Sequence, residues 1–108
     1  MRNTGLHLAV AVLTALAACS AQAKDKAFGE YLSAECAACH QLTGRYDGIP
    51  PIVGWPDPTF IEIMNEYRAR KRANAVMQTI AARLSDEEIA ALAAYFGSIP
   101  TQPTSMNK

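Results

Sequence analysis

The sequence predicts an all-α fold, with about four short helices and one loop rich in glycine and proline. Three observations support this prediction. Apolar residues recur at helical spacing in several segments, no segment alternates convincingly with the period of a strand, and turn-forming residues gather between the first two helical segments. With 108 residues, half of them hydrophobic, the chain is long enough for one small domain.

The N-terminus has the layout of an export signal. Arg2 precedes an apolar run over residues 6–18, and small residues then lead into a charged stretch. Because this run is too short to span a bilayer comfortably, we expect an exported protein with no membrane span.

Two processing sites compete in this segment. The sequence "AQA" predicts cleavage after Ala23, which makes residues 1–23 a signal peptide. The sequence "LAAC" instead resembles a bacterial lipobox, in which the signal would end at residue 18 and Cys19 would carry a lipid anchor. We expect a folded domain over residues 24–100 and a disordered, polar tail over residues 101–108.

Removal of the signal leaves few groups that can bind a metal. The full chain has ten basic and ten acidic side chains, and residues 1–23 contain only Arg2 among them, so the mature charge is near minus one. A chain with this balance lacks the excess of basic residues that is typical of nucleic-acid-binding proteins. In the mature chain His40 is the only histidine, and Cys36 and Cys39 are the only cysteines.

Each predicted helix follows from its composition or its start signal. The first, over residues 27–40, contains no proline and is rich in Ala, Glu and Leu. The second begins with Asp57 as N-cap and Pro58 at the first helical position. The last begins at Ser85, which forms a capping box with Glu88. The apolar stripes of the second, third and last helices are Phe60, Ile63, Met64 and Tyr67; Val76, Met77, Ile80, Ala81 and Leu84; and Ile89, Leu92 and Phe96.

The segment between the first two helices must be a shaped loop. It reads "LTGRYDGIPPIVGWP" over residues 42–56, with three glycines and three prolines. Short helices rich in alanine around such a loop bury little apolar surface. Domains of this size usually need an additional stabilising element, such as a disulfide or a bound metal. A large apolar prosthetic group would supply the missing interior.

The motif that indicates this group is "AECAACHQ", residues 34–41. On a helix Cys36, Cys39 and His40 stand at i, i+3 and i+4, so their side chains share one face. Two thiols at this spacing can add to the two vinyl groups along one haem edge while the imidazole reaches the iron, and C-x-x-C-H is the attachment pattern of c-type haem. We therefore expect one covalently bound haem c per chain.

Other interpretations of the motif explain less. A structural zinc site needs four ligands, and a thioredoxin-like pair expects strands on either side of a helix. A disulfide between Cys36 and Cys39 would close a very short loop, restrain little and leave His40 without a role.

The residue pattern alone does not identify which residue supplies the second axial ligand of the iron. The mature chain has no second histidine, which leaves Met64, Met77, Met106, a lysine or a free position. Met106 lies in the polar tail, and Met64 sits on an apolar stripe where methionine usually fills the core. Met77 follows the break "RKRANAV", where a loop could bring its sulfur across the haem from His40.

The chain resembles class I c-type cytochromes of the small bacterial periplasmic monohaem kind, and is similar to cytochrome subunits of sulfide-oxidising flavocytochromes. The matching pieces are "GEYLSAECAACH", "GIPPIVG" and "VMQTIAARLSDEEIAALAAYF", which with their spacing cover nearly all of residues 28–97. The resemblance implies the class I cytochrome c fold wrapped around one haem, a periplasmic location, and Met77 as the distal ligand.

The resemblance also implies roles around the haem. It makes the carbonyl of Pro50 the partner of the second ring nitrogen of His40, although Pro51 beside it leaves the register open. It implies that the first helix crosses the last helix through Gly29, with Phe28 or Tyr31 beside it, against Leu92, Tyr95 and Phe96.

Two further groups of residues have competing explanations. The loop side chains would either line the haem edge and bind its propionates or pack the loop; they are Trp55, Tyr46 and Arg45. The basic run either complements a helix dipole as solvated charge, which we expect, or forms a docking patch; it comprises Arg68, Arg70, Lys71 and Arg72.

The function predicted from these observations is one-electron transfer through a His/Met-ligated haem, between a redox protein donor and acceptor, without catalysis by the chain itself. Two alternatives stay open. The chain could be the haem subunit of a flavocytochrome-type complex with a flavoprotein partner, which an exposed apolar patch would favour. It could also be a ligand-binding haem protein with a displaceable Met77, which a high-spin spectrum would favour.

Overall fold

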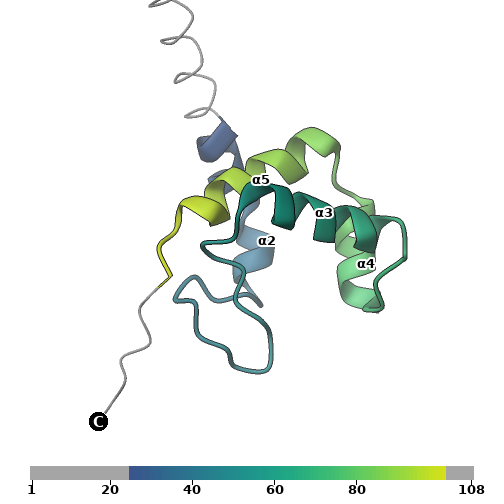
Figure 1. The fold of residues 1–108 in the computed structure, drawn as a ribbon, viewed down its shortest axis with the longest axis horizontal. Helices are drawn as coiled ribbons and strands as arrows, with labels where there is room; N and C mark the ends of the chain where they lie inside the picture. Colours follow the sequence, from purple (N-terminus) through teal and green to yellow (C-terminus); the bar gives the residue numbers. More distant parts are fainter. Residues whose placement is uncertain (1–24, 102–108) are drawn as a thin grey trace, which may run out of the picture.

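The computed structural model describes residues 25–101, and the regular secondary structure in this part of the chain is helical, which confirms the predicted all-α class (Figure 1). No strand occurs in this part of the chain. A helical segment over residues 25–32 is followed by α2 (Ala34–Ala37), α3 (Asp57–Arg68), α4 (Ala75–Ala82) and α5 (Asp86–Ser98). The predicted signal with its two cleavage sites and Cys19, and the tail with Met106, lie outside the described residues.

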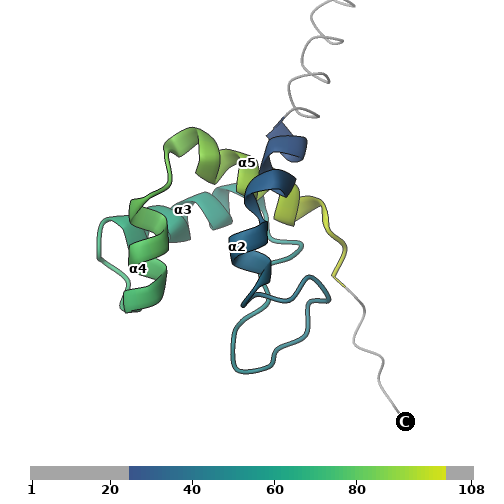
Figure 2. The same cartoon turned by 180° about the vertical axis from the view of Figure 1, so that it is seen from behind.

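Helix α3 is the centre of the fold, because it packs against both α4 and α5 (Figures 1 and 2). The rings of Phe60 on α3 and Phe96 on α5 are stacked with their centroids 5.9 Å apart. The loop adds to the same core, and Gly54 N–H at its end donates a 2.9 Å hydrogen bond to Phe96 O. The buried core cluster is Ile52, Val53, Phe60, Met64, Ala81, Ile89, Leu92, Ala93 and Phe96.

The predicted single helix over residues 27–40 is interrupted at Ser33. This side chain is buried, and its Oγ donates a 2.7 Å hydrogen bond to Glu30 O. Serine hydroxyls that bind nearby backbone carbonyls compete with regular helix geometry. The prediction of one continuous helix over residues 27–40 is therefore wrong: the helical hydrogen bonding is interrupted at Ser33, although its dihedral angles stay helical, and α2 ends at Ala37.

The first helical segment crosses α5 through Gly29, as the resemblance implied (Figure 2). A Cβ placed on Gly29 would lie 2.0 Å from Ala91 O and 2.8 Å from the Cβ of Tyr95, so only glycine fits this approach. Leu92 and Phe96, which were also expected at the crossing, belong to the core cluster. Tyr31 is 81% exposed, so the aromatic contact comes from Tyr95 on α5.

Helix starts agree with the sequence signals in part. The capping box of Ser85 and Glu88 is confirmed at the start of α5. The prediction of Asp57 as N-cap is wrong, because α3 already includes Asp57 and its N-cap is Pro56, which offers no side-chain bond. Measured over the described residues, no helix combines the length and apolarity needed to cross a membrane.

Candidate functional site

A cavity of about 560 Å³ lies between the end of α2, the loop, α3 and the start of α4. Figure 2 shows α4 on one side of α3 and α2 on the other. The volume falls within the range of ligand pockets, about 300–1,000 Å³. The walls are mainly apolar and include Ile52, Trp55, Phe60, Ile63, Met64, Tyr67 and Ile80, while Cys36, Cys39, His40 and Met77 also line the cavity.

The cysteine pair keeps the spacing of a helical turn although α2 ends before it is complete. The N–H groups of Cys39 and His40 both donate to Cys36 O, at 3.1 and 2.7 Å. This turn brings both sulfurs and the imidazole to one cavity. Cys36 is half-buried, Cys39 is exposed, and both are free thiols.

The two thiols differ in their surroundings. Burial raises the pKa of Cys36, the negative charge of Glu35 raises it further, and the backbone hydrogen bond at Cys36 lowers it in part. The thiol of Cys36 therefore stays protonated at neutral pH in the chain before any covalent attachment.

His40 has one ring nitrogen committed to the backbone. Its Nδ1 lies 2.7 Å from Pro50 O, so the partner in the loop is Pro50 and not Pro51. A carbonyl oxygen can only accept a hydrogen bond, so Nδ1 carries a proton, and in the neutral imidazole the lone pair is then on Nε2. The ring of His40 is thereby fixed in the tautomer that can bind a metal through Nε2.

Two methionines line the cavity, and they differ in their packing. Met64 on α3 is 6% exposed and belongs to the buried core cluster. Met77 lies in the first turn of α4, is half-buried, and packs against that cluster from outside. The side chain of Asn74, the N-cap of α4, accepts a 3.0 Å hydrogen bond from Met77 N–H and so fixes the backbone at this position.

Of the loop side chains considered from sequence, only Trp55 lines the cavity. It contacts Phe60 edge-on, with ring centroids 6.5 Å apart. Tyr46 is 72% exposed, and neither it nor Arg45, also exposed, is among the lining residues. These two therefore do not form the wall of the cavity.

The lining residues that carried no assignment to the cavity from sequence include Tyr67, Arg72 and Asn74. The guanidinium of Arg72 lies 5.7 Å from the Tyr67 ring centroid, and its Nε donates a 3.0 Å hydrogen bond to Glu66 Oε2. Arg72 remains exposed, with 45% of its side chain accessible, so it keeps the expected solvated charge while it also contacts Tyr67 and Glu66. The N-cap preference of asparagine could have identified Asn74, whereas nothing local indicated the contacts of Arg72.

Within residues 25–101 no group of three or more His, Cys, Asp or Glu side chains is arranged to hold a metal ion. A zinc centre built from such side chains therefore has no counterpart in this part of the chain. The donors that do converge at the apolar cavity are two thiols, one imidazole nitrogen and the thioether sulfurs of two methionines.

Comparison with known proteins identifies the family. The sequence matches the family Cytochrome c over residues 27–100. Cytochrome c-554(548) of Halomonas halodenitrificans is 40% identical over 83 residues, covering 70% of this chain and 98% of that protein. The cytochrome subunit of sulfide dehydrogenase from Chlorobaculum tepidum is 33% identical over 72 residues, 66% of each protein. The thiosulfate dehydrogenase electron acceptor of Stutzerimonas stutzeri is 35% identical over 68 residues, 60% of this chain and 32% of that protein.

The aligned part of the chain thus spans nearly all of the first of these relatives, just under two thirds of the second and about a third of the last. The chain belongs to the cytochrome c family of haem electron-transfer proteins, as a class I c-type cytochrome whose cofactor is a covalently bound haem c.

Proposed function

We propose that this chain is a periplasmic monohaem electron carrier whose iron is bound between His40 and Met77. One observation carries the proposal: a single apolar cavity is lined by the cysteine pair, by His40 with its Nδ1 proton held by Pro50, and by Met77.

The residues of the cavity fit a c-type haem in number and in chemistry. Cys36 and Cys39 would form the two thioethers, His40 Nε2 would bind the iron on one side, and the sulfur of Met77 would bind it on the other. The bound haem supplies an iron centre that gains and loses one electron.

The chain tunes that centre through its own residues. Pro50 O holds the Nδ1 proton of His40 and so orients the ring, as partners of metal-binding histidines generally do. The thioether sulfur of Met77 is a soft donor that favours the reduced state and raises the potential. The apolar walls exclude water from the iron, which also raises the reduction potential.

With both axial donors supplied by the chain, no coordination position is left for a substrate. We therefore propose a carrier that exchanges electrons with redox proteins and does not catalyse a reaction by itself.

A second candidate function is that of a haem subunit bound to a redox enzyme. The partner, for example a flavoprotein subunit, would dock beside the haem and exchange electrons with it. Relatives named as a sulfide dehydrogenase subunit and as an acceptor of thiosulfate dehydrogenase electrons support partners of this kind.

The periplasmic location rests on the N-terminal sequence. We propose cleavage after Ala23, which would release a chain that starts at Lys24. The intact mass of the exported protein tests this, since it should correspond to a chain that begins at Lys24 plus one haem. A diacylglyceryl group found on Cys19 would instead make the protein a tethered carrier.

Absorption spectroscopy of the unmodified protein tests the ligation. The ferric form should show the weak far-red band of sulfur-to-iron coordination, and the ferrous form should be low-spin and slow to bind carbon monoxide. A ferric protein without this band, together with rapid carbon monoxide binding, would support a ligand-binding haem protein and overturn the carrier.

A further inference from the structure

The helix that carries Met77 has few neighbours. Helix α4 packs against α3 and, among the labelled helices of the described chain, against no other. The position of Met77 relative to His40 therefore depends on how firmly α4 is held to α3.

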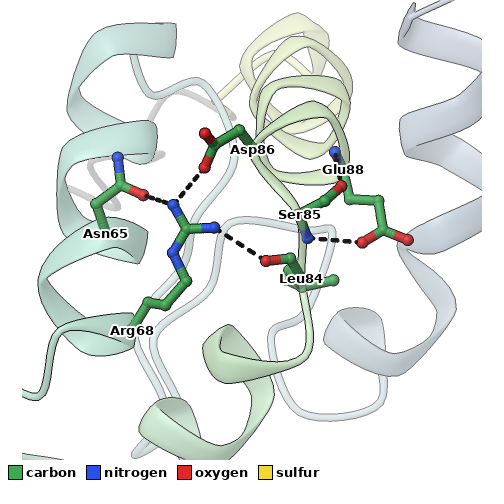
Figure 3. Close-up of polar contacts among 6 residues, drawn as sticks. All are labelled: Asn65, Arg68, Leu84, Ser85, Asp86 and Glu88. Carbon is green, nitrogen blue, oxygen red and sulfur yellow. Dashed lines mark hydrogen bonds and ion pairs between the residues drawn. The ribbon is translucent and has the colours of Figure 1, made fainter.

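Arg68, in the last turn of α3, reaches the chain that leaves α4 (Figure 3). Its Nη1 donates a 3.0 Å hydrogen bond to Leu84 O. Its Nη2 donates to Asn65 Oδ1 at 2.7 Å and also contacts Asp86 Oδ1. One guanidinium thus connects α3 to the segment between α4 and α5.

The bonds of Arg68 differ in strength. The side chain of Asp86 is 88% exposed, so solvent screens its ion pair with Arg68 and the pair contributes little. The bonds to Leu84 O and Asn65 are partly buried and charge-assisted, which makes them stronger than neutral ones. Leu84 O also lies just past the last turn of α4, where carbonyls have no intrahelical donors.

The start of α4 is held separately. Gln78 Nε2 donates a 3.0 Å hydrogen bond to Arg72 O, and Asn74 caps the helix at Met77 N–H. The first half of α4 is therefore bonded to the connection that follows α3, whereas Arg68 on α3 itself supplies the side-chain attachment beyond the C-terminal end of α4.

We propose that Arg68 is a positioning residue that keeps α4 closed against α3 and so keeps the sulfur of Met77 directed at the haem iron. This inference rests on the proposed His/Met ligation. Loss of the guanidinium should let α4 open more often without unfolding the core of α3 and α5, because their contact through Phe60 and Phe96 does not involve Arg68.

The test compares Arg68→Met with Arg83→Met in the holoprotein. Arg83 directly follows α4, but its only ion pair with another of residues 25–101 is a 3.9 Å contact with Glu35 between exposed side chains. The measurements are the rate of carbon monoxide binding to the ferrous protein, and the temperatures at which the far-red band and the helical circular dichroism are lost. Arg68→Lys, which keeps the charge but not the two-pronged donor, provides a milder variant if Arg68→Met fails to fold.

We expect Arg68→Met to bind carbon monoxide about tenfold faster, equivalent to about 1.4 kcal/mol in the opening of α4, and Arg68→Lys to fall between it and the unmodified protein. The far-red band should disappear below the temperature at which helicity is lost, and Arg83→Met should change neither quantity. If band and helicity still disappear together in both Arg68 variants, with unchanged carbon monoxide rates, the positioning role is wrong. If the unmodified protein lacks the band, the His/Met ligation fails instead.

Discussion

His40 and Pro50 are joined by a 2.7 Å hydrogen bond from the imidazole Nδ1 to the backbone carbonyl oxygen. The loop between α2 and α3 brings these two residues together, although ten positions separate them in the sequence. Because the acceptor belongs to the backbone, the proline ring itself is not required for this contact.

Pro50→Ala should therefore leave the ligation of the iron intact. The carbonyl remains, so the far-red band and the reduction potential should stay close to those of the unmodified protein. The greater freedom of the unfolded chain should lower the free energy of unfolding by about 0.4–1 kcal/mol, measured by denaturant titration. Pro51→Ala is the matched control. A large change of potential in Pro50→Ala alone would show that the ring, and not only the carbonyl, holds His40.

The covalent attachment gives a direct prediction. Two thioethers from Cys36 and Cys39 would keep the haem on the polypeptide, so acid-acetone extraction should leave the colour with the protein. Cys36→Ala or Cys39→Ala should leave at most one link and mature poorly, as seen in the yield of holoprotein and its mass. Free haem in the organic phase after extraction of the unmodified protein would contradict the assignment.

The crossing of the first helical segment over α5 predicts a large effect from one methyl group. In Gly29→Ala the new Cβ would meet Ala91 O and Tyr95, so the two helices must move apart. Such overpacking costs about 1–3 kcal/mol in the free energy of unfolding. Glu30→Ala, at the exposed neighbouring position, should change stability much less. Equal effects in a denaturant titration would mean that the crossing is not tightly packed.

The sequence was sufficient to predict features that depend only on residues close together in the chain. The Ser85–Glu88 capping box needs residues three apart, and the C-x-x-C-H spacing defines its own turn, so both could be recognised without the fold. The break at Ser33 was missed because helix propensity alone favours a continuous helix there. Asp57 was assigned as a cap because the pattern did not indicate that α3 starts one residue earlier.

Contacts between segments that are distant along the chain could not be predicted from the sequence. The bonds of Arg68 to Leu84 and Asp86 span 16 and 18 positions, and a basic run at a helix end looks like solvated charge until the α4–α5 connection is placed beside it. Spacing alone likewise did not indicate that Val76, on the predicted apolar stripe, lines the cavity and lies outside the buried core cluster.

The backbone conformation at the end of α3 indicates that one substitution there should stabilise the protein. Arg70 has a φ of 60° and follows the C-cap Ala69, while Lys71 N–H donates to Glu66 O at 2.9 Å and Arg70 N–H to Tyr67 O at 3.0 Å. This is the Schellman arrangement, in which glycine is usual at the left-handed position. Arg70→Gly should raise the free energy of unfolding by about 1 kcal/mol, with part of the gain offset by the freedom of glycine in the unfolded chain.

Arg70→Ala separates this backbone effect from the loss of charge. Alanine keeps a Cβ and therefore the strain, so thermal unfolding should show a gain for Arg70→Gly and none for Arg70→Ala. If the two variants are stabilised equally, repulsion within the basic run is the cause and the backbone is not.

The last prediction concerns which methionine, Met77 or Met64, supplies the sulfur ligand that keeps small molecules from the iron. Both line the cavity, but Met77 lies on the surface of the core cluster with its backbone fixed by Asn74, whereas Met64 is buried within the cluster. Met77→Ala should abolish the far-red band, lower the potential because a soft donor to ferrous iron is lost, and open the iron to carbon monoxide. Met64→Ala should keep the band and lower the free energy of unfolding by about 2–5 kcal/mol. Survival of the band in Met77→Ala with its loss in Met64→Ala would assign the sulfur ligand to Met64.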